Sequence, residues 1–206
     1  MTKTASLEQQ DLPVDGDSAR ADVYALLGAL LAKPPDAAFL AQLEQIPVSD
    51  PAEDGTLAAA WATLKIAAAR ADPKALREEY HDLFIGLGRG ELVPYGSWYV
   101  TGFLMEKPLA ALRVDLQQFG LERQDAVYEP EDHAGALCET MSLLVLSGED
   151  VPVEQQRQFF ERHIAPWMGR FFGDLAAAKA ARFYRAVGLL GERFLEVERE
   201  YLAMLA

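Results

Sequence analysis

Apolar residues recur at every third or fourth position along most of this chain, and this spacing constrains the fold more than any other feature. In the first such segment they stand at positions 23, 26, 27, 30 and 31, which together form one face of an α-helix. The segment 183–201 repeats steps of four and three over a longer span. No segment alternates apolar and polar residues with β-branched enrichment, as a half-buried strand does. The sequence therefore predicts an all-α protein.

Helix-breaking residues divide this pattern into a bundle of about eight or nine helices. Asp72 followed by Pro73 marks a helix start, and Gly120 marks a stop. Pro108 lies inside a long helical stretch, so we expect a kink or a break there. The predicted helices cover the stretch from residue 18 to about 32, then 36–45, 57–71, 73–85, 97–119, 131–147, 152–165 and 180–205.

The chain has 206 residues, enough for one domain or two small ones. Residues 1–17 are polar and are expected to form a loose tail. A hinge is expected near 121–130, and it divides the remainder into helical subdomains 18–120 and 121–206 of one domain.

The charge is strongly acidic, because 19 basic residues stand against 32 acidic ones and give a net charge of −13. This balance argues against binding to nucleic acid, which calls for a basic face. Residues 121–154 alone contain nine acids and one base. A cationic partner is one interpretation of this charge, and solubility is the other.

Cysteine content and hydropathy indicate a cytoplasmic protein. Cys138 is the only cysteine, so no internal disulfide is expected, and its place on a predicted helix favours packing over reactivity. The N-terminal residues lack an apolar stretch of signal-peptide length. The longest apolar run, 25–32, is too short to span a bilayer, so stable membrane insertion is not expected.

Catalytic and metal-binding patterns are weak. A di-iron bundle needs two Glu-x-x-His pairs, and only Glu78–His81 has this spacing. The glycines at 86, 88 and 90 follow a helix and lack the Gly-Lys-Ser/Thr of a phosphate-binding loop. We therefore expect no enzyme, no metal and no cofactor. The alternative is a small helical enzyme or cofactor carrier that uses Glu78, His81, Asp132 and His133.

Three motifs set this chain apart from a plain helical bundle. They are Glu79-Tyr-x-x-Leu-Phe-x-Gly-x-Gly88, Pro94-Tyr-x-Ser-x-Tyr99 and Glu129-Pro-x-Asp-His133, and Phe160-x-x-His-x-x-x-Trp167 follows. In this order the motifs resemble the TorD/DmsD/NarJ family of redox-enzyme maturation chaperones. The resemblance implies a cytoplasmic, TorD-like helical chaperone for a molybdopterin oxidoreductase.

By this resemblance, the partners are the twin-arginine signal peptide of the enzyme precursor, the apoenzyme, or both. It leaves open the client, which can be of the trimethylamine oxide reductase, dimethyl sulfoxide reductase or formate dehydrogenase type. It also leaves open a monomer or a domain-swapped dimer, and guanine-nucleotide binding, for which the residues give no independent support.

A receptor for two guanidiniums and an apolar stretch needs carboxylates beside an aromatic or apolar groove. If a helix begins near Glu131, Asp132 and Glu139 lie about 20° apart around its axis. Aromatic side chains of the preceding loop would supply the wall. The predicted client-binding residues are Tyr95, Ser97, Trp98, Tyr99, Glu129, Pro130, Asp132, His133 and Glu139. The alternatives are that Glu131 and Asp132 only complement the helix dipole, and that the aromatics and His133 belong to the core.

Overall fold

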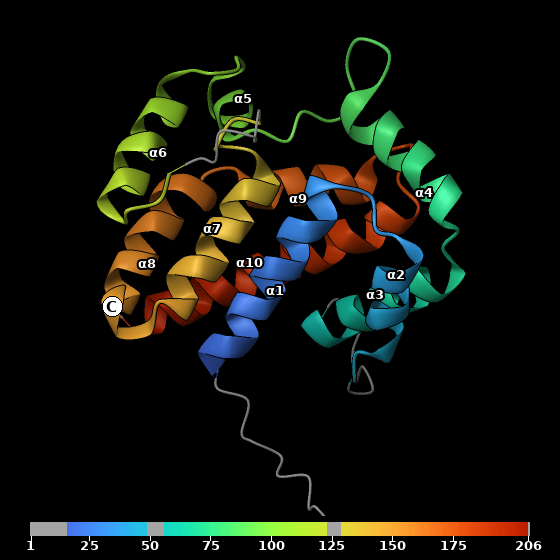
Figure 1. The fold of residues 1–206 in the computed structure, drawn as a ribbon, viewed down its shortest axis with the longest axis horizontal. Helices are drawn as coiled ribbons and strands as arrows, with labels where there is room; N and C mark the ends of the chain where they lie inside the picture. Colours follow the sequence, from blue (N-terminus) through green and yellow to red (C-terminus); the bar gives the residue numbers. More distant parts are fainter. Residues whose placement is uncertain (1–15, 49–55, 123–128, 206) are drawn as a thin grey trace, which may run out of the picture.

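The protein is all-α, as predicted, in a computed structural model that describes residues 16–48, 56–122 and 129–205 (Figure 1). Within these ranges there are no β-strands. The helices are α1 (Gly16–Ala32), α2 (Ala37–Gln45), α3 (Leu57–Arg70), α4 (Pro73–Tyr80), α5 (Gly96–Thr101), α6 (Lys107–Gln118), α7 (Ala134–Leu146), α8 (Val153–Phe159), α9 (Met168–Ala177) and α10 (Phe183–Met204). None of the helices in the described ranges is long and apolar enough to cross a lipid bilayer.

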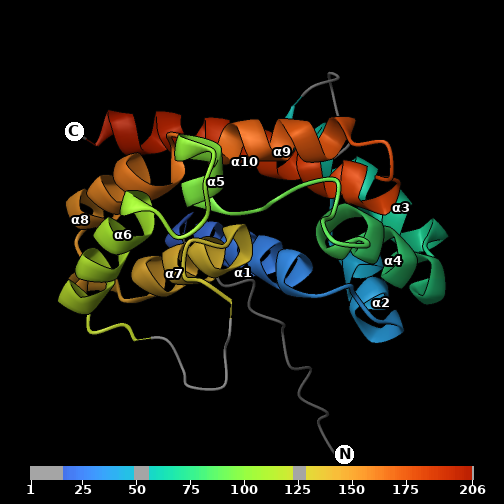
Figure 2. The same cartoon turned by 90° about the horizontal axis from the view of Figure 1, so that it is seen from above.

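Helices α1, α7, α9 and α10 form the centre of the molecule. Helix α1 packs along α7, and α10 packs against α9, α3 and α1 (Figure 2). Glycine permits the close approach of α10 to α9, because a Cβ atom on Gly188 would lie 2.6 Å from the backbone nitrogen of Ala176. One continuous core runs through all of these helices. The two predicted subdomains therefore share their core, since α1 belongs to one and α7 to the other.

A buried ion pair fixes α1 to the C-terminal half of α10. The Arg20 guanidinium donates to both carboxylate oxygens of Glu198, at 2.9 and 2.7 Å, and Glu198 is only 1% exposed. Gln156 of α8 accepts a further bond from Arg20 and donates to a backbone carbonyl. Because every partner is hydrogen-bonded, the charges are accommodated within the core.

Helices α2, α3 and α4 gather at one end of the molecule, together with the N-terminal end of α10 (Figure 1). Helix α4 continues into a short π-helix, η1 (His81–Ile85). The Glu79 carboxylate accepts hydrogen bonds from the backbone N–H groups of residues 182, 183 and 184, and so caps the start of α10. Segment 86–95 then crosses the molecule from α4 to α5 at the other end (Figure 2).

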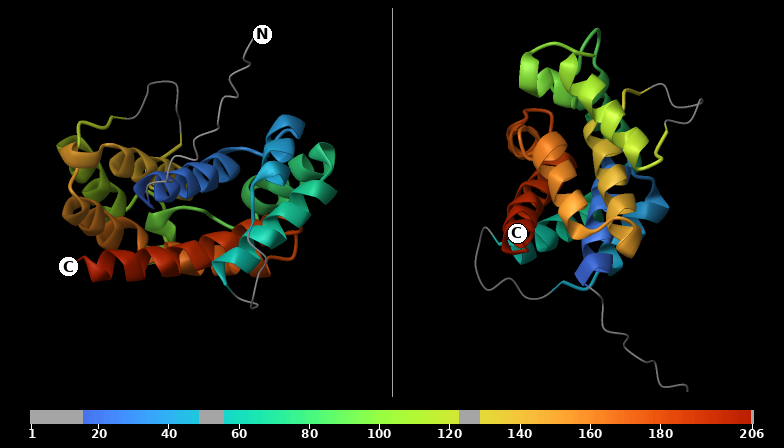
Figure 3. Two further views of the ribbon diagram at one scale, coloured as in Figure 1. Left: turned by 90° about the horizontal axis from the view of Figure 1, so that it is seen from below. Right: turned by 90° about the vertical axis from the view of Figure 1, so that its left-hand side faces the viewer.

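Helices α5, α6 and α8 gather at this other end (Figure 3). Helix α8 (Val153–Phe159) passes into a second π-helix, η3 (Phe160–Ile164), beside α6. A 3₁₀ turn, η2 (Gly148–Asp150), joins α7 to α8. The predicted hinge lies largely on residues 123–128, outside the described residues, and so does most of the predicted tail.

Two predicted helix boundaries were wrong, and one helix was missed. The helix predicted over 97–119 is two helices, and the break lies at 102–106, where Gly102 and Met105 have φ of 83° and 57°. The break expected at Pro108 thus occurs just before it, and Pro108 lies in the first turn of α6, where its missing N–H costs nothing. Helix α9 was not predicted. Helix α7 begins at Ala134, so Glu131 and Asp132 precede it.

Candidate functional site

Two sequence motifs meet at a clasp between the 94–97 turn and the 132–134 segment. The carbonyl of Pro94 accepts from the N–H of Ala134 at 2.8 Å, and the carbonyl of Asp132 accepts from the N–H of Gly96 at 2.9 Å. The Asp132 side chain accepts from the N–H of Ser97 through Oδ2 at 2.7 Å. The backbone and side chain of Asp132 thus hold the first turn of α5 against the start of α7.

Two polar atoms inside this clasp lack a partner among the described residues. Asp132 is 3% exposed and Ser97 is 0% exposed. Within the described part of the chain, neither Asp132 Oδ1 nor Ser97 Oγ has a hydrogen-bond partner. An unpaired buried carboxylate oxygen is costly, so a donor that enters the site gains a strong acceptor.

A cavity of about 220 Å³ adjoins Asp132. Its walls come from α5, α6 and the segment that ends at Trp167, and they are mainly apolar: Val100, Pro108, Leu112 and Trp167. Trp167 is held by its indole N–H, which donates to the carbonyl of His163 at 2.7 Å. Glycine at position 96 allows this close packing, since a Cβ atom there would lie 3.1 Å from the indole nitrogen. Asp132 is therefore buried, but it borders a hollow.

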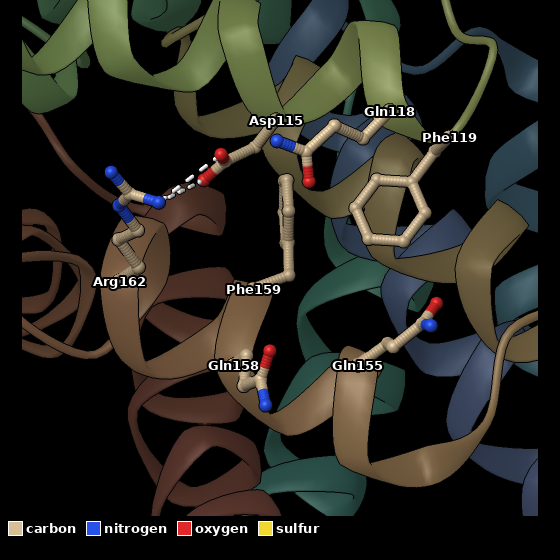
Figure 4. A pocket seen from close by; sticks show the side chains of 7 residues that line it. All are labelled: Asp115, Gln118, Phe119, Gln155, Gln158, Phe159 and Arg162. Carbon is tan, nitrogen blue, oxygen red and sulfur yellow. Dashed lines mark hydrogen bonds and ion pairs between the residues drawn. The ribbon is translucent and has the colours of Figure 1, made fainter.

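A second acidic group lies next to this cavity, between α6 and η3. The Asp115 carboxylate contacts His163 Nε2 at 2.6 Å and the Arg162 guanidinium at 2.9 Å. Arg162 and Asp115 also line a neighbouring cavity of about 240 Å³. Figure 4 shows the rings of Phe119 and Phe159 in its wall, which lie edge to face with centroids 6.0 Å apart. Asp115 is thus neutralised by its own partners, in contrast to Asp132.

The two buried histidines at this site favour the neutral form. Burial lowers the pKa of His133, and the nearby carboxylates of Glu129 and Asp132 offset this only in part. His133 Nδ1 accepts the N–H of Gly135 at 3.1 Å, which requires an unprotonated nitrogen. Burial also lowers the pKa of His163, against the opposing effect of Asp115. Neither imidazole therefore adds a positive charge near neutral pH. Arg162, which also lines the cavity, is a cation that is paired with Asp115.

The remaining motif aromatics do not line the Asp132 cavity. The Tyr95 hydroxyl donates to Glu129, and its ring lies edge-on to His133 with centroids 5.2 Å apart. Trp98 lies under the guanidinium of Arg89 at 4.8 Å. Tyr99 packs on Trp167 and donates to Asp174, so it anchors α5 to α9. The expected continuous aromatic wall is therefore divided over different surfaces.

Glu139 and Asp132 do not form the expected pair on one helix face. Because α7 begins only at Ala134, the helical angle between the two residues does not apply. Glu139 is exposed and lies along α1, where its side chain contacts the position of Gly28. The carbonyl of Pro130 accepts the N–H of His133 and shapes the turn before α7. Glu131 pairs with Arg113 of α6 at 2.9 Å.

The walls of the cavity were not predicted from the sequence, although one motif contains two of the residues that form them. The Phe-x-x-His-x-x-x-Trp motif of residues 160–167 contributes both His163 and Trp167 to the cavity. The four residues of the alternative enzyme or cofactor site differ in burial. Glu78 and His81 are exposed, whereas Asp132 and His133 are buried. In the described ranges no group of three or more His, Cys, Asp or Glu residues is arranged to hold a metal ion.

Comparison with known proteins adds a family and several relatives. The sequence model of the family described as nitrate reductase delta subunit matches residues 50–173. The chaperone protein TorD of Vibrio atlanticus is 25% identical over 62% of this chain and 64% of its own length. A protein of Haemophilus influenzae described as a Tat proofreading chaperone, DmsD, is 31% identical over 59% of each chain. The matches thus span less than two thirds of these relatives.

A solved structure shares the fold. The crystal structure of a protein from Archaeoglobus fulgidus described as a redox enzyme maturation protein superposes with a TM-score of 0.55. It covers 94% of this chain and 99% of its own, at 19% sequence identity. At this identity the similarity shows the fold alone.

Proposed function

Because this chain belongs to the nitrate reductase delta subunit family, we propose that it is a maturation chaperone for a molybdopterin oxidoreductase. It binds the twin-arginine signal peptide of the precursor, the apoenzyme, or both, assists cofactor insertion and delays export until that step is complete. It acts in the cytoplasm, where a precursor that awaits export is made. The relatives named as TorD and DmsD chaperones support this role, and the family membership confirms the resemblance drawn from the motifs.

The unpaired Oδ1 of buried Asp132, beside a mainly apolar cavity, is the observation that carries the signal-peptide part of the proposal. An arginine side chain matches both features, because its methylene stem packs on apolar walls and its guanidinium donates to a carboxylate. Ser97, whose N–H holds the other oxygen of Asp132, does not itself line the cavity, so Asp132 is the acceptor that the proposal uses. Lysine, with a compact and strongly hydrated charge, suits such a site less well.

The surroundings of the cavity fit the rest of a signal peptide. Glu129 is exposed close to the clasp and offers a carboxylate to the second arginine. Val100, which lines the cavity, is followed along the chain by Phe103 and Met105, which are 69% and 73% exposed. Exposed apolar side chains of this kind mark interaction sites. They provide an apolar surface for the stretch that follows the arginine pair.

The test is a calorimetric titration of the protein with a synthetic twin-arginine signal peptide and with its Lys-Lys counterpart. Loss of one charge-assisted hydrogen bond corresponds to about 1.5–3 kcal/mol, or roughly a tenfold or greater rise in Kd. We expect this rise in Asp132→Asn and with the Lys-Lys peptide. Asp174→Asn is the matched control, because Asp174 is an exposed carboxylate bonded to a tyrosine on another surface. Equal affinity of the wild type and Asp132→Asn for the twin-arginine peptide would rule out this site.

A further inference from the structure

Charge is distributed unevenly over this acidic protein. The end formed by residues 33–91 and 179–185 carries nine basic and seven acidic residues in its described part. The rest of the described chain carries eight basic and 18 acidic residues. Figure 1 shows that the first group includes α2, α3 and α4, opposite to the end formed by α5, α6 and α8. The sequence of residues 49–55 adds three acids to this range, which then carries nine basic and ten acidic residues. The range remote from Asp132 is thus close to neutral, whereas the rest of the molecule is strongly acidic.

At this end, a cavity of about 460 Å³ lies between α3, α4 and the start of α10. Its floor is apolar and includes Ala67, Leu76 and Phe183, and Ile66 on its wall is 52% exposed. Three arginines from different elements line it, namely Arg70 at the end of α3, Arg182 just before α10 and Arg185 within α10. All three are exposed.

The charges of these arginines are not balanced by ion pairs in the part of the chain that the structure describes. Among the ion pairs of the described residues, none involves Arg70, Arg182 or Arg185. The two acidic side chains that line the cavity both accept hydrogen bonds from backbone N–H groups. Asp72 accepts the N–H of Ala75 as the cap of α4, and Glu79 caps α10. Three guanidiniums therefore face solvent around an apolar floor.

The position of Glu79 argues against a phosphate group as the ligand. A free helix N-terminus is the usual seat of a phosphate, because its N–H groups point toward the anion. Here the N–H groups of residues 182, 183 and 184 already donate to the Glu79 carboxylate. A phosphate would meet that negative charge instead of free donors. Carboxylates held further apart, on a chain that also carries apolar side chains, match the arginines and the floor together.

We propose that the cavity between α3, α4 and α10 is a docking site for an acidic peptide segment of a partner protein, in which leucine-like side chains alternate with glutamate or aspartate. The apolar side chains contact the Ile66, Ala67 and Phe183 surface, and the carboxylates pair with Arg70, Arg182 and Arg185. This site is separate from the Asp132 cavity, and it selects the opposite charge. The protein thereby holds a cationic and an anionic ligand at its two ends.

The test uses fluorescence anisotropy with a labelled synthetic peptide that repeats Leu-Glu-Glu-Leu, and a control peptide with glutamine in place of glutamate. We expect the wild type to bind the acidic peptide, and Arg70→Gln/Arg185→Gln to bind it at least about tenfold more weakly. Ile66→Glu, on an exposed wall, should weaken it as well. Arg199→Gln is the matched control, because Arg199 is an exposed arginine far along α10 and away from the cavity. The twin-arginine peptide should bind unchanged to the double variant, which separates this site from the Asp132 site.

Three outcomes would overturn the proposal. One is that the wild type fails to bind the acidic peptide, or binds the glutamine peptide equally well. Another is displacement of the peptide by equimolar inorganic phosphate, which would indicate a simple anion site. The third is concentration-dependent self-association that disappears in Arg70→Gln/Arg185→Gln, which would make a second copy of this chain the occupant. Sedimentation of both proteins measures this last outcome.

Discussion

Ser97 and Asp132 are joined across 35 positions of sequence by a hydrogen bond of 2.7 Å, from a backbone N–H to a buried carboxylate. This bond fixes the first turn of α5 at the mouth of the candidate site, and it occupies only one of the two carboxylate oxygens. Asp132 thus holds α5 in place through one carboxylate oxygen and keeps the other oxygen as a free acceptor. Different substitutions at this position distinguish the two roles.

Replacement of Asp132 by alanine leaves the buried N–H of Ser97 without an acceptor. We expect Asp132→Ala to lower the free energy of unfolding by about 1–3 kcal/mol. Asp132→Asn keeps a carbonyl oxygen for this N–H and removes a buried charge, so its stability should stay within about 1 kcal/mol of the wild type. Urea denaturation followed by circular dichroism measures both values. Equal destabilisation by the two substitutions would contradict the role given to the Ser97 bond.

The carboxylate of Glu79 organises the start of α10 from a distant part of the chain. Its removal in Glu79→Ala exposes three N–H groups at a helix N-terminus, and we expect a loss of about 1–2 kcal/mol in unfolding free energy. Hydrogen exchange should accelerate at residues 182–184 before it does so elsewhere in α10. Glu78→Ala is the control, because Glu78 is the exposed neighbour on α4. Unchanged exchange at 182–184 would show that the cap contributes nothing.

The contact between α9 and α10 depends on the absence of a side chain at Gly188. A Cβ atom there would lie 2.6 Å from the backbone nitrogen of Ala176 and 2.7 Å from the carbonyl oxygen of Phe172. Backbone cannot rotate away as a side chain can, so Gly188→Ala should cost about 1–3 kcal/mol. Gly169→Ala, with nothing within 4 Å of the new methyl group, should be neutral or stabilising. Thermal unfolding of both variants provides the comparison.

Acid should destabilise the fold through His133 before the carboxylates titrate. Burial places the folded-state pKa of His133 below that of the unfolded chain, which is about 6.5. The unfolded state therefore binds more protons as the pH falls through this value, and stability present above it is progressively lost. Urea denaturation should give a smaller unfolding free energy at a pH between these two pKa values than at neutral pH. The pH dependence should diminish in His133→Gln and persist in His81→Gln, since His81 is exposed.

Sequence periodicity predicted most helices because their stability comes from one buried face. It failed at 97–119 because Phe103 and Leu104 continue the apolar pattern, whereas the backbone turns at Gly102 and Met105 and leaves both side chains largely in solvent. Helix α9 was missed although Met168, Phe171, Phe172 and Leu175, all buried, have helical spacing. Glycines at 169 and 173 and the preceding Pro166 made this segment resemble a loop.

The candidate site was predictable only in part. The motifs drew attention to Asp132 and Ser97, which the structure places in contact. The cavity beside them could not be derived, because its walls come from α5, α6 and the residues around Trp167, and local patterns do not encode such tertiary contacts. The prediction that Asp132 and Glu139 lie about 20° apart on one helix was wrong for a related reason. The clasp with the 94–97 turn holds Asp132 outside α7, and a helix boundary set by tertiary hydrogen bonds is not visible in local sequence.

The uneven charge gives the molecule a permanent electric dipole along the line from α6 to α4. The electric field of a charged partner exerts a torque on this dipole. The torque aligns the two molecules before they touch. A cationic peptide would meet the end formed by α5, α6 and α8 first. Added salt would lower the association rate more than it would raise the dissociation rate. The orientation of the protein before contact would then contribute to its preference for a cationic peptide, in addition to the contacts within the cavity.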